Sequence, residues 1–95
     1  MTRQEVIKVF KSIATKTNYE AKIDYNVNYN YICSNENIKL FLDNNFLGIY
    51  EFNSYNGYIR IINNKLYDIN NIVKIVYQNN KITIYEKNNK FSIPF

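Results

Sequence analysis

The chain has 95 residues, of which 46% are hydrophobic and 17% aromatic, with a formal net charge of +4 and no histidine. This length suits one domain with a modest core, and the hydrophobic content excludes a disordered chain. The lack of histidine excludes Ser-His-Asp triads and other histidine-based catalysis, and one cysteine cannot build a structural zinc site. We therefore expect a single non-enzymatic domain, residues 1–95, without metal or cofactor.

An amphipathic helix is predicted over residues 2–14. Thr2 and Glu5 have the T-x-x-E spacing of a capping box, in which each side chain bonds the backbone amide of the other residue. Gln4, Lys8 and Lys11 fall on the polar side. The apolar stripe repeats at three- and four-residue steps, which predicts packing on a sheet, and it comprises Val6, Phe10, Ile13 and Ala14, widened by Ile7 and Val9.

Residues 21–33 alternate between apolar and polar side chains almost without interruption, which predicts extended structure. One face of this segment holds Ala21, Ile23, Tyr25, Val27, Tyr29, Tyr31 and Cys33. The segment is long against a usual strand of about five or six residues. It therefore either bends near residues 26–28 or forms a hairpin there.

The rest of the chain predicts short strands joined by asparagine-rich turns. Residues 38–42 fit a strand better than a helix, and residues 46–52, apolar on both sides, predict a central strand. Asn56-Gly57 is the best hairpin signal, because a type I′ turn needs two residues that tolerate positive φ. Further strands are predicted at residues 58–62, 72–78, 81–86 and 90–95, with turns at 34–37, 43–45, 63–64, 79–80 and 88–89.

The stretch 65–71 is predicted to be irregular and anchored by Leu66 and Ile69. In the strand at 58–62, Ile59 and Ile61 should face inward. The side chains expected in the core from the last three strands are Val73, Ile75, Tyr77, Ile82, Ile84, Phe91, Ile93 and Phe95. Together the elements predict an α+β fold, with one N-terminal helix packed on a curved antiparallel β-meander of five to seven strands.

Tyrosine is the residue type that points most directly to a function. The chain holds ten tyrosines and no tryptophan. Tyrosine and arginine are favoured in protein interfaces because they bury a large area at a small entropic cost. The alternative is that these tyrosines cover sheet faces with their hydroxyls in water. The predicted partner-binding residues are Tyr25, Tyr29, Tyr31, Tyr55, Tyr58 and Arg60.

The charge distribution supports a second hypothesis, a nucleic-acid-binding domain. Residues 1–22 and 65–95 each carry a net charge of +3, whereas residues 23–64 carry −2. The segment GYIRI at 57–61 resembles the glycine-aromatic strand of RNA-recognition and cold-shock domains, whose aromatic side chains stack on bases. It departs from that pattern at Asn56, where a basic residue is usual, and at Ile59, where a small one is. The residues predicted for this alternative are Lys8, Lys11, Tyr58, Arg60, Lys74 and Lys81.

Residues 66–95 resemble LytTR-type DNA-binding domains and bacterial PH-like domains in their strand, Asp-Ile, strand, turn, strand rhythm. In the first family a helix should follow, and in the second the helix should come last, whereas the predicted helix here comes first. The rhythm is shared by many β-meanders, so neither family is assigned.

The leading hypothesis is a small protein-binding module that acts by steric occlusion. Its size and composition resemble those of phage and mobile-element inhibitors of host defence, including anti-CRISPR proteins. The expected partner is a host protein or protein–nucleic-acid complex, with direct nucleic-acid binding or a homodimer as alternatives. No apolar run approaches the roughly 18 residues of a membrane helix. Cys33 is expected to be a half-buried apolar residue, which favours a reducing cytoplasm.

Overall fold

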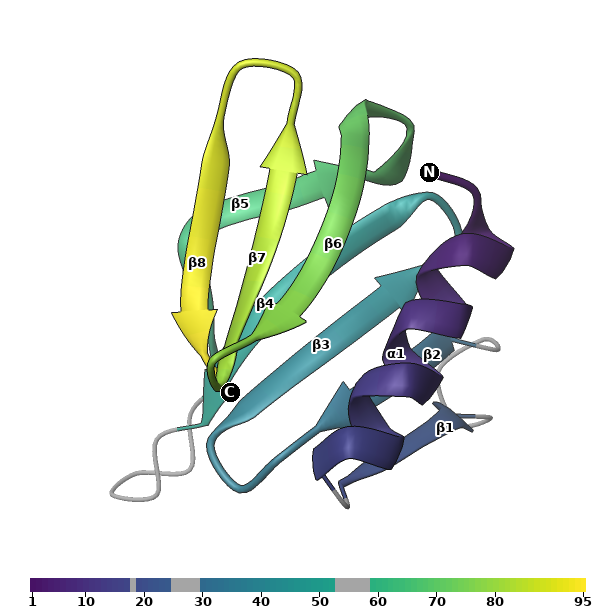
Figure 1. Ribbon diagram of the computed structural model, residues 1–95, viewed down its shortest axis with the longest axis vertical. Coiled ribbons are helices and arrows are strands. Elements are labelled where there is room, and N and C mark those ends of the chain that lie inside the picture. The colour runs from purple at the N-terminus through teal and green to yellow at the C-terminus, as the bar shows by residue number, and fades with distance from the viewer. Residues whose placement is uncertain (18, 25–29, 53–58) are drawn as a thin grey trace.

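The computed structural model describes residues 1–17, 19–24, 30–52 and 59–95 (Figure 1). The helix α1 (Arg3–Thr17) precedes five strands: β1 (Glu20–Asp24), β2 (Asn30–Ser34), β3 (Ile38–Asp43), β4 (Phe46–Phe52) and β5 (Ile59–Asp68). A 3-10 helix (Ile69–Asn71) leads to β6 (Ile72–Gln78), β7 (Lys81–Glu86) and β8 (Lys90–Pro94). All pairs are antiparallel, and they form a five-stranded sheet, β1 to β5, and a three-stranded sheet, β6 to β8.

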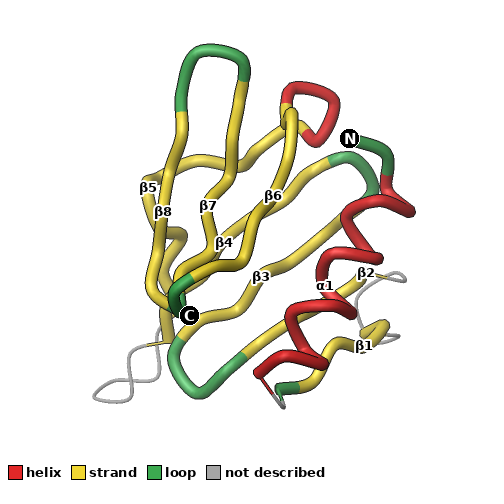
Figure 2. Tube along the Cα trace, viewed as in Figure 1, coloured by secondary structure: helices red, strands yellow, loops and turns green. Residues whose placement is uncertain are grey.

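The molecule has two layers. Figures 1 and 2 show α1 and the three-stranded sheet side by side over the same face of the five-stranded sheet. We call this covered face of the five-stranded sheet the inner face and the opposite one the outer face. The core between the layers is formed by Val6, Phe10 and Ile13 of α1, by Leu40, Leu42, Leu47 and Ile49 of the inner face, and by Ile75, Ile82, Ile84 and Ile93. The predicted α+β class, with one N-terminal helix, is confirmed.

The capping box predicted for α1 is present. The Glu5 amide donates to Thr2 Oγ1 at 3.2 Å, and the Thr2 amide donates to Glu5 Oε1 at 2.9 Å. The helix runs to Thr17, one turn beyond the predicted end. Its last two threonines donate their hydroxyls to the carbonyls four residues earlier, Thr15 to Lys11 at 2.9 Å and Thr17 to Ile13 at 2.7 Å. These bonds let threonine remain helical where its propensity alone predicts an end.

The long alternating segment forms a hairpin, as one of the two alternatives predicted. In the pair β1–β2, Ala21 lies opposite Cys33, and Ile23 lies opposite Tyr31. Residues 25–29 between them lie outside the described part of the chain. The split raises the number of strands among the described residues to eight, one above the predicted range, and these strands divide into two sheets instead of one meander.

Asparagine takes a left-handed backbone at four described positions: Asn44 (φ 50°), Asn63 (65°), Asn79 (54°) and Asn80 (59°). All four lie at positions predicted as turns, because asparagine is the non-glycine residue that best tolerates this conformation, and three of them, Asn44, Asn79 and Asn80, lie in turns of the structure. The turn predicted at residues 63–64 is wrong. There Asn63 lies within β5, beside a shift in register between Gly48 and Tyr50 of β4, and the strand continues to Asp68.

Register shifts also change which side chains are buried. In the stretch 65–71, the buried anchor is Tyr67, which is 1% exposed, and not the predicted Leu66, which is 50% exposed. A second shift between Ile72 and Lys74 leaves Val73 62% exposed and buries Ile72 instead. Ile61 pairs with Tyr50 and so lies on the outer face, against the prediction that it faces inward. The hairpin tip predicted at Asn56-Gly57 lies outside the described residues.

Polar contacts join segments that are distant in the chain. The Lys65 ammonium of β5 forms an ion pair with the Glu86 carboxylate of β7. The backbone nitrogen of Met1 donates to the Ile69 carbonyl at 2.7 Å and to the Ile72 carbonyl at 2.9 Å.

In the described part of the chain, no helix is long and apolar enough to span a membrane.

Candidate protein-binding surface

The outer face is built by alternate residues of β3, β4 and β5. Residues directly opposite each other in antiparallel strands point to the same face of a sheet. This register produces three rows across the strands: Lys39, Tyr50 and Ile61; Phe41, Gly48 and Leu66; and Asp43, Phe46 and Asp68. Apolar side chains therefore fill the middle of the face, with Asp43 and Asp68 at the end near Phe46, Lys39 beside Tyr50 on β3, and Phe52 extending the apolar surface beyond the Lys39 row.

Large apolar side chains on this face are open to solvent. Phe46 is 49% exposed, Phe52 is 47% exposed and Leu66 is 50% exposed. They are three of the five exposed large hydrophobic residues in the described part of the chain. With three half-buried neighbours they form what we call the outer patch, which comprises Phe41, Phe46, Tyr50, Phe52, Ile61 and Leu66.

Gly48 allows the aromatic rings of the outer patch to pack closely against the backbone. A Cβ at this position would lie 2.7 Å from Tyr50 Cε2 and 3.1 Å from Leu66 Cδ2, so the Tyr50 ring occupies the space of the missing side chain. The rings of Phe41 and Tyr50 meet edge to face, with centroids 5.8 Å apart. The Lys39 ammonium lies 5.9 Å from the Phe41 centroid. The result is an aromatic surface packed close to the backbone of Gly48, with the Lys39 ammonium at its side.

Acidic groups mark the end of the outer patch near Phe46. Asp43 and Asp68 flank Phe46 in the third row. The Asp68 carboxylate also accepts the Asn70 amide at 3.0 Å, which holds it at the start of the 3-10 helix. An apolar centre with a polar rim is the usual anatomy of a protein interface.

The predicted partner-binding residues are not brought together within the described part of the chain. Tyr25, Tyr29, Tyr55 and Tyr58 lie outside it, and Tyr31 is placed only by its backbone register in β2, opposite Leu42. Arg60 is exposed and forms an ion pair with Glu51 of β4.

Sequence reasoning missed the outer patch, although the signal was present. Residues 46–52 are apolar on both sides, a pattern that predicts a central strand, and β4 does lie between β3 and β5. In the structure Leu47 and Ile49 are buried, whereas Phe46 and Phe52 on the other side are about half exposed.

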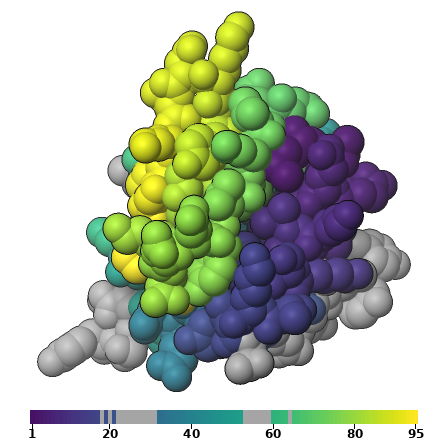
Figure 3. Space-filling model, in the orientation of Figure 1, coloured from purple at the N-terminus to yellow at the C-terminus, as the bar shows by residue number. Residues whose placement is uncertain are grey.

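The residues predicted for nucleic-acid binding lie mostly in the layer formed by α1 and the three-stranded sheet. Lys8 and Lys11 are exposed on α1, and Lys74 and Lys81 are exposed on the strand positions that point away from the core. Residues 1–17 and 72–95 hold eight basic and two acidic residues, a net charge of +6, whereas residues 20–68 hold four and six, a net charge of −2. Figure 3 views the basic layer, where the surface of α1 adjoins that of β6 to β8.

Reactive groups are scarce in the described residues. They contain no group of three or more His, Cys, Asp or Glu side chains that could hold a metal ion. Cys33 is fully buried on the inner face, and its Sγ lies 3.7 Å from the Phe10 carbonyl oxygen, to which the thiol donates. Burial raises the pKa of the Cys33 thiol to about 11. This thiol is therefore un-ionised at neutral pH and unsuited to nucleophilic chemistry.

Comparison with known proteins assigns no family to this chain. No family model matches the sequence, and neither a curated protein nor a solved structure matches it significantly. The outer patch is therefore a candidate binding surface on the basis of its geometry alone.

Proposed function

We propose that this chain is a non-enzymatic protein-binding module that covers part of a partner protein with its outer patch. One observation carries the proposal. Phe46, Phe52 and Leu66 stand about half exposed on a sheet face that no described helix or strand covers.

An exposed aromatic sheet face is costly unless a partner covers it. Antiparallel sheets that face water usually carry polar side chains on that side. Contiguous apolar patches on soluble proteins mark interaction sites, and aromatic side chains in the centre of an interface supply much of its binding energy. The charges at the rim of the outer patch indicate which groups the surface of the partner should carry. It should present an apolar surface with a basic group facing Asp43 and Asp68 and an acidic group facing Lys39.

Steric occlusion suits a module of this kind, because covering a surface needs no reactive group. An inhibitor of host defence carried by a phage or mobile element would work in this way. The occluding action and this biological setting are parts of the proposal and rest on size, composition and the outer patch.

The test compares capture by matched variants. Tagged protein would be incubated with nuclease-treated lysate of the source host at moderate salt, and bound proteins identified by mass spectrometry. The outer-patch variant is Phe46→Ser with Leu66→Ser. The control is Val73→Ser, which removes an apolar side chain that is 62% exposed on β6.

We expect one stoichiometric protein with the wild type and with Val73→Ser, and its loss with the double variant. Circular dichroism and urea unfolding would confirm that both variants fold. Capture that survives the double variant, or recovery of nucleic acid alone when nuclease is left out, would contradict the proposal.

The net charge of +6 on the layer of α1 and β6 to β8 supports a second candidate, direct nucleic-acid binding. If about six phosphates are contacted, affinity should fall roughly a thousandfold between about 50 and 200 mM salt. Charge reversal at Lys74 and Lys81 should weaken such binding and leave capture through the outer patch unchanged. An affinity that does not respond to salt would exclude this candidate.

A further inference from the structure

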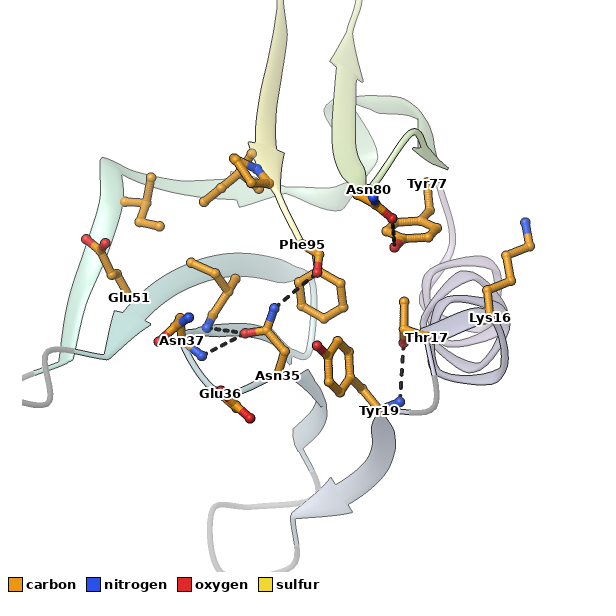
Figure 4. A pocket seen from close by; sticks show the side chains of 14 residues that line it. Lys16, Thr17, Tyr19, Asn35, Glu36, Asn37, Glu51, Tyr77, Asn80 and Phe95 are labelled. Atoms are coloured by element: carbon orange, nitrogen blue, oxygen red, sulfur yellow. Dashed lines mark hydrogen bonds between the residues drawn. The ribbon is translucent and has the colours of Figure 1, made fainter.

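A depression of about 790 Å³ lies where the end of α1 meets the β2–β3 turn and the ends of β6 and β8 (Figure 4). The rings of Tyr19, Tyr77 and Phe95 form part of its wall, and the Phe95 ring meets both tyrosines edge to face. Polar groups in it bond within the chain: Asn35 Nδ2 donates to the Phe95 carbonyl at 3.3 Å, and the Tyr77 hydroxyl donates to Asn80 Oδ1 at 3.4 Å. These contacts join distant segments of the chain, and none of them indicates a ligand.

The outer patch, by contrast, carries the same groups that we expect on the surface of its partner. Lys39 and Asp43 lie on either side of Phe41 along β3, and alternate residues of a strand point to the same face. Their Cα atoms are four residues apart, about 13 Å in an extended strand. In the described part of the chain, neither of the two charged side chains has an ion-pair partner. An apolar surface with an unpaired base and an unpaired acid can therefore pair with a second copy of itself.

Two copies of the patch can stack face to face in two ways. Stacked sheets lie about 10 Å apart, with strand directions within about 30° of each other. If the two-fold axis runs across the strands, each strand lies over its own copy in the opposite direction, and Lys39 faces Asp43 of the second copy. If the axis runs along the strands, β3 lies over β5, and Asp43 faces Asp68 of the second copy. Only the first arrangement pairs opposite charges, so the charges select it.

The same arrangement places apolar side chains against apolar side chains. With the axis over the middle row, that of Gly48, this row lies over its own copy, and Tyr50 lies over Phe46 of the second copy. Asp68 then faces Ile61 of the second copy. Both lie on β5, the edge strand of the sheet, where the carboxylate can stay in water.

We propose that a second copy of this chain covers the outer patch about this axis, with Lys39 of each copy paired to Asp43 of the other. Three rows across three strands give a footprint of about 20 by 14 Å on each copy. This area, about 280 Å², is well below the roughly 800 Å² that each partner buries in a standard interface. The dimer should therefore be weak, and a tighter partner should displace it. The second copy thus regulates the proposed function, on which this role rests, by competing for the same patch.

Sedimentation equilibrium of the full chain measures this association without any partner protein. We expect a reversible dimer of the wild type with a dissociation constant of about 10–100 μM. Lys39→Glu and Asp43→Lys should each weaken it at least about tenfold, because each replaces two attractions by two repulsions. Lys81→Glu makes the same charge change at an exposed position of β7, outside the patch, and should stay within about twofold of the wild type. Circular dichroism reports whether each variant folds.

A mixture of the two charge-reversed variants gives the sharpest result. In a mixed dimer the two introduced charges face each other with opposite signs, and the native Lys39 still faces the native Asp43. An equimolar mixture of Lys39→Glu and Asp43→Lys chains should therefore associate within about threefold of the wild type. A folding defect in either variant cannot produce such a recovery. If either reversal unfolds the chain, Lys39→Gln and Asp43→Asn should each weaken the dimer about threefold or more.

A wild type that stays monomeric up to about 1 mM would overturn the proposal. So would association that both reversals leave unchanged, that Asp43→Lys strengthens, or that the mixture of two folded variants fails to recover. None of these outcomes bears on capture of a partner protein by the outer patch. Absence of that capture, with the dimer intact, would contradict the proposed function alone.

Discussion

The two sheets of this protein share one core but expose outward surfaces of opposite character. On the three-stranded sheet the outward positions are mostly polar or basic, with Val73 and Val76 as aliphatic exceptions: the hydroxyls of Thr83 and Ser92 pair at 2.8 Å, and the Lys74 ammonium lies over the Tyr85 ring. On the five-stranded sheet the corresponding positions of β4 hold Phe46 and Phe52, each about half exposed. The first surface is largely polar, and the second is the one for which we propose an apolar partner.

The contrast shows where a candidate binding surface can be sought in a chain without histidine. Both sheets bury isoleucine and leucine on the sides that face each other. They differ at the alternate strand positions, which point away from the core and which packing within the chain therefore does not constrain. Apolar residues at such unconstrained positions carry information about a partner, whereas apolar residues in the core carry information about the fold.

Thiol labelling should show the largest difference between the inner and outer faces. With a pKa of about 11, only about a thousandth of Cys33 thiols are ionised near pH 8, against roughly a quarter at an exposed site of pKa about 8.5. A Phe52→Cys variant in a Cys33→Ala background should therefore react with Ellman's reagent at least about 100-fold faster than the wild type.

Rising pH should accelerate the reaction of Cys33, since its thiolate fraction grows about tenfold per pH unit below its pKa. Similar rates for the wild type and the Phe52→Cys variant would show that the outer patch is covered or that the inner face is open.

Alanine substitutions on the two faces of β4 test the difference between the inner and outer faces through the free energy of unfolding. Ile49 is fully buried, so Ile49→Ala should lower the free energy of unfolding by about 2–5 kcal/mol. Phe52 is 47% exposed, so Phe52→Ala should cost about 1 kcal/mol or less. Urea unfolding followed by circular dichroism measures both changes. A loss for Phe52→Ala as large as that for Ile49→Ala would mean that the outer patch belongs to a core.

A tyrosine on each sheet provides a matched test of binding. Once a partner has been captured, Tyr50→Ala should weaken its affinity at least about tenfold, because Tyr50 lies in the middle of the outer patch. Tyr85→Ala on the three-stranded sheet should leave the affinity within about twofold. Calorimetric titration measures both. The reverse order of effects would move the binding surface to the basic layer.

The capping box of α1 should give the smallest effect, and its pH dependence can be stated. Hydrogen bonds from the backbone and side chain of Thr2 lower the pKa of the Glu5 carboxyl from its ordinary 4.5. The ionised carboxylate therefore stabilises the fold above about pH 4.5, and this contribution is lost as pH falls through the lower folded value. Thermal unfolding should show Glu5→Gln slightly less stable than the wild type at neutral pH. The difference in stability between Glu5→Gln and the wild type should disappear in acid. A difference that persists in acid would show that it does not arise from the ionised Glu5 carboxylate.

Much of the fold could be predicted because its signals are local. The spacing of Thr2 and Glu5, the stripe of Val6, Phe10 and Ile13, and the asparagine turns depend only on near neighbours in the chain. The errors fall where register decides the outcome. The shifts near Asn63 and between Ile72 and Lys74 exchange inward and outward residues, because a strand shifted by one residue turns every side chain to the other face.

The sequence by itself determined the helix, its cap, the strand-rich remainder, the asparagine turns and the absence of histidine chemistry. The tertiary structure alone decided how eight strands divide between two sheets and which apolar face the molecule leaves open. It also brought Tyr19, Tyr77 and Phe95, distant in sequence, to one depression. The physical reason is that propensity and periodicity act over a few residues. Burial depends on which distant segment packs on a face, and nothing in the sequence of Phe46–Phe52, which is apolar on both sides, specifies that.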